Sequence, residues 1–485
     1  MGDRRLVGVD LGIASAHTVR VLDGQGNVVA KRRAWPTVES LSDIERAALA
    51  GAVEGTRLEV VMEPTGPAWL PIAVFFTSRG HVVHRVSSAK SHDLRKFLSR
   101  HTKTNGIDAD TLARIPLFDP SGVQPLVLAT EERAGLDRRV RATDRLTRAG
   151  ADHKRRIKDL TRQVMPMTPL TGAISRSDLA VLERYADPNA LVRLGAKRLA
   201  KIIAKASANK HGTDRAVEWI AAATSALELY RDHPAVAFVA IAEEIATEVR
   251  LLRAVEAERA RHAAAREDRY LVVDPDQLAR SIPGFSTIGG PSLVACMGDP
   301  ARFAKGKQFR SFTGLTPKAS ETGNTDRKGQ PMSKAGSSLL RTTLIRAADI
   351  GRRHDPQLAR IYYIQMVERG KTHLGALCVV AANLAERAWT VMNRNSPYIV
   401  CDVDGTPVTN EQAKAIIADC WTVPAEVRAR RRSAKATPKG KAPQAISTRQ
   451  PTPYANGADT RDDLPRSTSS TPRPHQIKTL AESPA

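Results

Sequence analysis

The first 115 residues alternate between short apolar runs and polar turns, which is the pattern of an α/β domain. A mostly apolar strand is predicted at Leu6–Gly12, and a hairpin is predicted around the turn Asp23–Asn27. A polar helical stretch at 40–50 precedes a further strand at Leu58–Met62. A helix at 68–78, a strand at 81–86 and an apolar helix beginning near Asp108 complete the order β, β, β, α, β, α, β, α.

Two acidic residues fall at the ends of these strands. Asp10 lies on the first strand, and Glu63 ends a later one because Pro64 cannot donate to a sheet ladder. The order of elements resembles the ribonuclease-H-like α/β fold, and open α/β sheets place their sites at the carboxyl ends of strands. We therefore expect Asp10, Glu63 and Asp108 to meet over one face of the sheet.

Helical periodicity dominates from residue 131 onward. Two charged segments, 131–162 and a second around 245–255, carry apolar residues at steps of three and four. They predict amphipathic helices that either pair as a helical arm or coiled coil or serve as ordinary bundle helices. The expected fold class is α/β plus α, with an α/β domain at 1–130, a helical or coiled-coil segment at 131–275 and a compact, mainly helical domain at 276–400.

Three stretches of the C-terminal half lack an apolar period. Ser281–Gly290 contains two glycine-punctuated turns, which either let backbone amides approach phosphates, as in a helix-hairpin-helix, or form a plain tight turn between core helices. The polar loop Lys318–Gly329 is long and rich in hydroxyl groups, as functional loops often are. Residues 425–485 are basic and then rich in Pro, Ser and Thr, which predicts a disordered tail that binds nucleic acid non-specifically.

The charge balance points to a polyanionic partner. The chain has 74 Lys and Arg against 51 Asp and Glu, a formal net charge of +23. Nucleic acid is the expected partner, because each neutralised phosphate releases a counterion and adds affinity. The plain alternative is an Arg-rich composition with a basic tail. The four cysteines form no Cys-x-x-Cys pair and no run approaches about 20 apolar residues, so we expect a reducing, cytoplasmic location at the nucleoid, no structural metal site and no membrane.

The acidic residues suggest a chemistry once they are taken together. Phosphodiester cleavage with two Mg²⁺ ions needs several carboxylates converging on ions about 4 Å apart. Magnesium prefers oxygen ligands, and acids at strand ends supply them. Each acid alone is more readily interpreted as a helix cap or a surface residue. Their joint placement, with the order of elements and the basic charge, favours a Mg²⁺ site.

A series of short motifs occurs in order along the chain. The motifs are Gly8-Val-Asp10, Met62-Glu-Pro-Thr-Gly66, Lys103-Thr-Asn-Gly-Ile-Asp-Ala109, Ile282-Pro-Gly-Phe-Ser-Thr-Ile-Gly289, Phe312-Thr-Gly-Leu-Thr-Pro317, Thr322-Gly323, Ser333-Lys-Ala-Gly336 and Leu340-Arg341. Together they resemble the transposases of the insertion sequence 110 family, also called DEDD transposases and related to the Piv-type invertases, over about residues 5–400. The resemblance implies a RuvC-like N-terminal domain with four metal-binding acids, a coiled-coil segment and a C-terminal transposase domain with a serine nucleophile.

The resemblance implies a DNA transposase or recombinase that moves its own element between double-stranded donor and target DNA, in some members guided by a structured RNA from the element. It assigns the metal ligands to Asp10, Glu63, position 105 and Asp108, but position 105 is an asparagine here. The Asn105 amide oxygen adds no charge, so Mg²⁺ would bind more weakly unless Asp110 compensates. Compensation requires Asp110 to precede the regular helix.

The nucleophile also departs from the family serine. The family register falls on Thr322, with Ser320 two residues earlier, and either hydroxyl could attack phosphorus. The alternative is that both hydroxyls only cap a turn. Strand exchange implies a homo-oligomer, a dimer or a tetramer. The residues expected to position DNA phosphates are Lys318, Arg327, Lys328 and Lys334.

Other functions fit parts of the pattern. A metal-dependent nuclease or junction resolvase would use water with the N-terminal acids alone. A non-catalytic nucleic-acid-binding descendant of a transposase would have lost its site at Asn105. An actin-like or sugar-kinase ATPase shares the first-strand motif Gly8–Gly12, but no second glycine-rich phosphate loop follows in the sequence.

Overall fold

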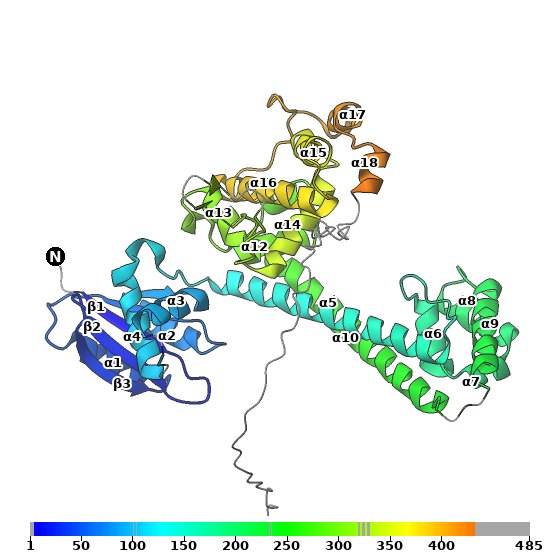
Figure 1. Ribbon diagram of the computed structural model, residues 1–485, viewed down its shortest axis with the longest axis horizontal. Helices are drawn as coiled ribbons and strands as arrows, with labels where there is room; N and C mark the ends of the chain where they lie inside the picture. Colours follow the sequence, from blue (N-terminus) through cyan, green and yellow to red (C-terminus); the bar gives the residue numbers. More distant parts are fainter. Residues whose placement is uncertain are drawn as a thin grey trace, which may run out of the picture. The chain divides into compact units, whose positions relative to one another are not determined.

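The computed structural model describes residues 4–99, 101–102, 104–231, 233, 235–318, 321–322, 325–326 and 330–431. The chain divides into two units, residues 1–432 and residues 433–485, and every described element belongs to the first unit. Figure 1 shows these elements coloured along the chain. The tail predicted to be disordered lies outside the described residues from position 432 onward.

The N-terminal part of the chain forms a mixed five-stranded sheet with the strand order β3-β2-β1-β4-β5. The strand β1 is antiparallel to β2 and parallel to β4, and β5 extends the parallel half. All five predicted strands are present. The elements are β1 Arg5–Asp10, β2 His17–Asp23, β3 Val28–Ala34, α1 Val38–Leu49, β4 Leu58–Met62, α2 Trp69–Ser78, β5 Val82–Arg85, α3 Ser88–Leu98, α4 Asn105–Phe118 and the 3-10 turn Pro120–Gly122.

Alternate side chains along the strands enter two different layers. Val7 and Val9 of β1 pack in a core with buried side chains of α1 and α2. Leu6, on the opposite face of β1, packs with Ala113 of α4, and Val61 of β4 packs with Leu112 of the same helix. The sheet is therefore covered by α1 and α2 on one face and by α4 on the other.

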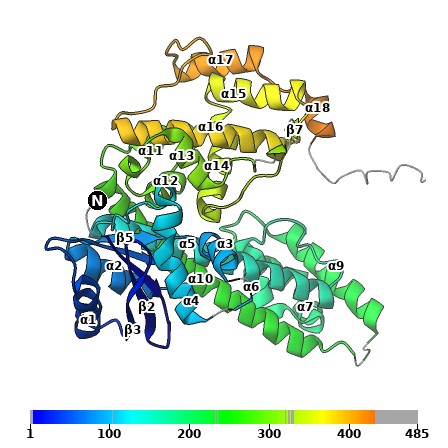
Figure 2. The ribbon, with the colours of Figure 1, turned by 60° about the vertical axis from the view of Figure 1, so that its left-hand side comes forward.

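Two long helices, α5 (Glu131–Val164) and α10 (Phe238–Val273), lie side by side, as Figure 1 and Figure 2 both show. The two helices run antiparallel. His153 of α5 hydrogen-bonds Glu248 of α10, whereas Arg139, which is earlier in α5, hydrogen-bonds His262, which is later in α10. The two predicted amphipathic segments thus pack against each other as an antiparallel pair. Between them, where the sequence suggested mixed helix and loop, lie α6 Arg176–Tyr185, α7 Pro188–Leu194, α8 Ala196–Ala206 and α9 Thr213–Tyr230.

The remaining elements surround a C-terminal helical core that also contains Leu136 of α5 and Tyr270 of α10. One end of the arm is thus part of this core, although the sequence pattern suggested a boundary near residue 275. The elements are α11 Leu278–Ser281, α12 Gly289–Met297, the 3-10 turn Pro300–Arg302, α13 Gly306–Thr313, β6 Glu321–Thr322, β7 Thr325–Asp326, α14 Ser338–Gly351, α15 Pro356–Tyr363, the π-helical turn Ile364–Glu368, α16 His373–Arg394, α17 Asn410–Cys420 and α18 Ala425–Arg430.

The helix α16 is the central element of this core. It has 22 residues and, by length and composition alone, is apolar enough to cross a membrane, but 44% of its most apolar window is buried within the protein. Leu377, Val380 and Leu384 are buried in the C-terminal core. Packing inside the protein therefore accounts for the apolar character of α16.

Three elements differ from the predictions. The helix α3 follows β5 where no helix was predicted, because it has no buried residue and hence no apolar period. The polar loop after Lys318 contains the short antiparallel pair β6 and β7. The first residues of the tail expected to be disordered instead form α18. Arg431, directly after α18, accepts a hydrogen bond from the His373 N–H with its carbonyl oxygen, and its guanidinium donates to the Gly370 carbonyl.

Candidate active site

Asp10 and Glu63 end two neighbouring parallel strands. Val9 of β1 is in register with Met62 of β4. The next residues, Asp10 and Glu63, therefore lie side by side, at the spacing of neighbouring strands, which is about 4.8 Å. Val9 and Met62 both pack in the core below α1 and α2. Because side chains alternate along a strand, both carboxylates belong to the opposite face, which α4 covers.

A glycine brings α4 into direct contact with β1. A Cβ atom at Gly8 would lie 1.9 Å from the Ala109 carbonyl oxygen and 2.5 Å from the Ala113 nitrogen, so no other residue fits here without moving the helix. Ala113 packs beside Leu6, so α4 runs antiparallel to β1. One turn before Ala109, the first helical residue, Asn105, therefore reaches the level of Asp10.

The N-terminal turn of α4 is shaped by its cap. Thr104 accepts a hydrogen bond from the Ile107 amide at 3.2 Å and starts the helix at Asn105. Asn105 and Asp108 are three residues apart, so both belong to the helix face that meets the sheet edge. The predicted metal ligands thus come from two strand ends and one helix start, as expected.

Two side chains of α3 bind these acids, and the sequence pattern did not single them out. Ser91 donates a hydrogen bond to Glu63 Oε2 at 2.6 Å, and Arg95 Nε lies 3.4 Å from Asp108 Oδ1. Ser91 and Arg95 are four residues apart and occupy one face of α3. The Ser87 cap at the start of α3 and the basic residues Arg95 and Lys96 in its last turn are local signals that could have revealed this helix from sequence.

The acids do not form one closed group in the described part of the chain, where no three His, Cys, Asp or Glu side chains lie close enough to hold a metal ion. Asp108 is paired with Arg95 instead. The residues nevertheless suit a hard cation, because Asp10, Glu63, Asp108 and Asn105 offer side-chain oxygens at one sheet edge. Occupation of the edge by a cation would require Arg95 to release Asp108.

Asp110 does not belong to this edge. It lies inside the regular helix and accepts a hydrogen bond from Arg114 Nε at 2.7 Å. The condition for Asp110 to compensate for Asn105, a position before the helix, is therefore not met. The pair explains Asp110 as an ordinary stabilising contact between residues four apart.

A buried histidine holds the loop that follows Asp10. Gly12 donates its backbone N–H to His17 Nδ1 at 3.1 Å, and the His17 side chain lies within the fold at 2% exposure. Burial lowers the pKa of His17 and so favours the neutral imidazole, whose Nδ1 accepts the hydrogen bond from Gly12. We call Asp10, Glu63 and Asp108, at the ends of β1 and β4 and the start of α4, the acidic edge. His17 lies near this edge, because its neighbour Thr18 is in register with Asp10.

Thr322, the first of the two candidate nucleophiles, lies in a two-stranded hairpin whose base is held by two of the sequence motifs. Lys318 donates its backbone N–H to the Pro331 carbonyl at 3.0 Å, and Ser333 donates to the Thr316 carbonyl at 2.9 Å. Gly336 packs so closely that a Cβ there would lie 2.0 Å from the Phe312 carbonyl oxygen. The motifs Phe312–Pro317 and Ser333–Gly336 therefore meet and support the hairpin.

Thr322 is in β6, in register with Thr325 of β7. Lys318 and Lys334 are exposed at the base of this hairpin, and Lys334 adopts a left-handed backbone conformation with φ of 55°. The predicted residues Ser320, Arg327 and Lys328, and the side chain of Thr322, lie outside the described part of the structure.

The predicted helix-hairpin-helix turn lies between α11 and α12. Gly284 has a φ of 94°, and a Cβ there would lie 2.0 Å from the Ala347 carbonyl oxygen in α14. The turn is thus packed against α14 and needs glycine for its conformation. Ser286 and Ile288, at the tip, are exposed.

Two family models match this chain. One is described as the transposase of the IS116/IS110/IS902 family and matches residues 276–363, which include the hairpin. The other is described as a transposase of the DEDD type named for IS110 and matches residues 7–166, which include the acidic edge. The two matches contain the two parts of the candidate site.

Curated relatives are similar over parts of the chain. The uncharacterized 42 kDa protein of insertion element IS900 from Mycobacterium paratuberculosis is 25% identical over 50% of this chain and 62% of its own length. The transposase for insertion sequence element IS1111A from Coxiella burnetii is 30% identical over 25% of this chain and 34% of its own. The pilin gene-inverting protein of Moraxella bovis is 25% identical over 25% of this chain and 38% of its own. This chain therefore spans less than two thirds of the length of these relatives.

Proposed function

The chain belongs to the IS110 family of transposases, and from this premise we propose that it is a DNA recombinase that cleaves and rejoins DNA to move an insertion sequence. The observation that carries the proposal is the position of Asp10 and Glu63 at the ends of adjacent parallel strands, beside the first turn of α4. A RuvC-like assignment of the N-terminal sheet is part of this proposal, as is a cytoplasmic site of action.

The acidic edge would hold Mg²⁺ through Asp10, Glu63 and Asp108, with the Asn105 amide as a neutral fourth oxygen ligand. A bound divalent ion there would supply positive charge to the phosphoryl oxygens as negative charge develops on them. Arg95 pairs with Asp108, and Ser91 donates a hydrogen bond that orients Glu63. These two side chains of α3 position the acids rather than take part in bond breaking.

The hydroxyl of Thr322 is the proposed nucleophile, with Ser320 as the second candidate. Its oxygen would form a bond to phosphorus as one phosphorus–oxygen bond of the DNA backbone breaks, which leaves a free DNA hydroxyl and a covalent protein–DNA link. The freed hydroxyl of the partner strand can later attack that link and restore Thr322. Lys318, Arg327, Lys328 and Lys334 would hold the flanking phosphates.

Trapping of covalent adducts on nicked element-end DNA tests this proposal. Thr322→Val should abolish the adduct and recombination, whereas Thr322→Ser should retain both; Ser320→Ala is the matched control. If Ser320→Ala alone abolishes the adduct, the second candidate is the nucleophile. If neither change reduces recombination, the reaction uses water, as in a metal-dependent nuclease or junction resolvase.

A non-catalytic DNA-binding role is the second candidate, and two observations favour it: Asn105 replaces an acid, and Asp108 is paired with Arg95. Under that role Asp10→Ala and Glu63→Ala would leave all activity in cells unchanged. Partners belong to the proposal as well: donor and target DNA duplexes, an element-encoded guide RNA and further copies of this chain. The DNA that flanks the gene tests the RNA: a structured non-coding segment there supports RNA guidance, and its absence removes the guide RNA from the proposal.

A further inference from the structure

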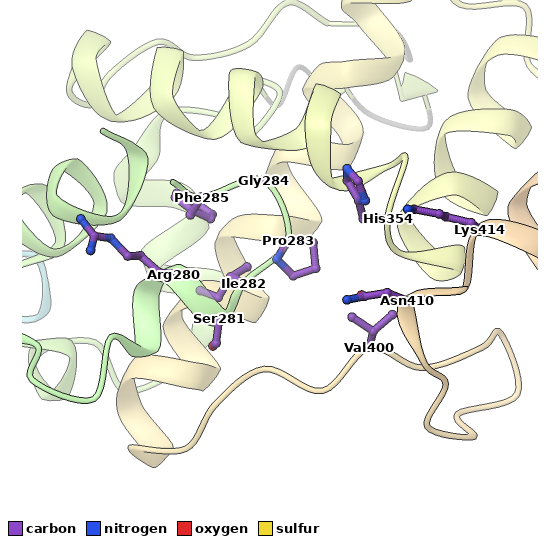
Figure 3. Close-up of a pocket in the computed structure, with 10 residues that line it drawn as sticks. All are labelled: Arg280, Ser281, Ile282, Pro283, Gly284, Phe285, His354, Val400, Asn410 and Lys414. Carbon is purple, nitrogen blue, oxygen red and sulfur yellow. The ribbon is translucent and has the colours of Figure 1, made fainter. Parts of the chain in front are cut away.

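A surface cavity of about 360 Å³ lies beside the turn Ile282–Phe285, and Figure 3 shows its lining. The opposite side is formed by His354, at the end of α14, and by Val400, Asn410 and Lys414, which come from the C-terminal segment around α17. That segment lies beyond the family match, which ends at residue 363. The cavity is therefore assembled from a family motif and from a part of the chain outside it.

The turn that forms one wall is rigidly held. Gly284 packs against Ala347, as described above, and a Cβ at Gly351 would lie 2.7 Å from the Pro283 carbonyl oxygen. Two residues of α14 thus fix the backbone of the turn from behind. A wall made of backbone in close contact with a helix stays in place when a ligand binds.

The C-terminal segment is fastened to the same core by hydrogen bonds. Tyr398 donates its backbone N–H to Ser281 Oγ at 2.8 Å and its hydroxyl to Asp355 Oδ2 at 2.6 Å. Gln357 donates to the Asp402 carbonyl at 2.7 Å. These contacts hold both flanks of Val400, so the second wall is also preformed.

The polar groups of the lining are suited to an anion. None of the ten described residues that line the cavity is acidic. Lys414 and His354 are exposed, they form no side-chain hydrogen bond or ion pair with another described residue, and Figure 3 shows Lys414 extending toward His354. Asn410 extends toward Pro283 and adds an amide donor. Arg280 points away from Lys414 and is paired with Glu267.

From this convergence we propose that the cavity binds a backbone phosphate of duplex DNA, with Lys414 as the charged contact and His354 and Asn410 as further hydrogen-bond donors. A compact ammonium with rotatable donors suits a phosphate oxygen that carries charge but no base identity. The inference rests on the proposed function only because it takes DNA as the ligand. It adds α17 to the DNA-binding surface, outside both parts of the candidate site.

The test measures the affinity of the full chain for a short DNA duplex over a series of salt concentrations. Lys414→Gln should weaken binding and lower the slope of log affinity against log salt by about 0.9, the loss of one phosphate contact. Lys414→Arg should keep the slope, because the charge remains. Lys201→Gln, which removes an exposed lysine of α8, is the matched control and should change neither quantity.

Each other outcome overturns the inference. An unchanged slope for Lys414→Gln, with wild-type binding intact, excludes the cavity while leaving the proposed function standing. An equal loss in Lys201→Gln assigns the effect to net charge. A loss of affinity for inorganic phosphate or for an RNA duplex, without loss for DNA, assigns the cavity to another ligand. Wild-type protein that binds no DNA overturns the proposed function itself.

Discussion

The guanidinium of Arg95 lies 3.4 Å from a carboxylate oxygen of Asp108, so one of the expected metal ligands is neutralised by a side chain of the neighbouring helix. Both side chains are largely shielded, with exposures of 15% and 22%. A cation at the acidic edge would compete with Arg95 for the same oxygen atoms. The pair therefore places a positive counter-charge beside Asp108.

Removal of that counter-charge should strengthen metal binding. We expect Arg95→Gln to tighten Mg²⁺ binding by about fivefold, since a charge contact between partly buried groups contributes on the order of 1 kcal/mol. Isothermal titration with Mg²⁺ measures the change. Arg114→Gln, which removes the partner of Asp110 on the same helix, is the control and should leave Mg²⁺ affinity unchanged. Equal affinities for wild type and Arg95→Gln would mean that Asp108 is not a ligand.

Asn105 offers a test of the edge in the opposite direction. Asn105→Asp places a carboxylate at the level of Asp10 and should tighten Mg²⁺ binding by roughly tenfold, with recombination retained. Its extra charge also favours the helix start electrostatically, so the melting temperature should not fall. The same titration and an in-cell excision assay provide the measurements. Loss of recombination in Asn105→Asp would show that the site is not built on the family geometry, and Asp110→Asn should have no effect on metal.

The strands and the acids were predictable because each depends on local pattern. Glu63 ends β4 because Pro64 follows it, and Asp10 ends an apolar run, so both could be placed at a sheet edge before the structure was known. The partners Ser91 and Arg95 were not predictable, because α3 is stabilised by caps and contacts rather than by a buried apolar face. The pairing of Asp108 with Arg95 depends on the packing of two helices, which no local pattern encodes.

The cavity between the turn Ser281–Gly290 and the segment around α17 was also not predictable from local sequence pattern. The glycines of Ser281–Gly290 predicted a tight turn, and Gly284 does adopt a backbone conformation that favours glycine. Nothing in the sequence linked that turn to Lys414, because the two are separated by more than a hundred residues and are brought together by the hydrogen bonds of Tyr398 and Gln357. Contacts of this kind follow from tertiary packing alone.

Gly8 should tolerate no side chain. Gly8→Ala would place its Cβ against the backbone of Ala109 and Ala113, so α4 must shift, and the free energy of unfolding should fall by about 1–3 kcal/mol. Urea unfolding followed by circular dichroism measures the loss. Gly24→Ala is the matched control, because its nearest neighbour would be 3.5 Å away, an ordinary contact. A stability loss no larger than that of Gly24→Ala would show that α4 does not lie against β1 at this point.

The buried imidazole of His17 should make the N-terminal fold sensitive to acid. Burial lowers its pKa in the folded state below the ordinary 6.5, so the unfolded chain binds the proton more readily. The stabilising contribution of neutral His17 is therefore complete above pH 6.5 and is lost as the pH falls below that value. His17→Gln keeps an acceptor for the Gly12 N–H and cannot be protonated, so its melting temperature should fall less between pH 7.5 and pH 5 than that of the wild type.

Thermal melting at a series of pH values provides the measurement. Some acid sensitivity should remain in His17→Gln, because burial also lowers the pKa of His373 in the C-terminal core. His101→Gln, at an exposed position, is the matched control and should retain the wild-type dependence. A His17→Gln variant with the same pH dependence as the wild type would show that the Gly12 loop is not held by a neutral imidazole. Because Thr18 is in register with Asp10, the same series followed by Mg²⁺ titration should show weaker metal binding once the loop is released.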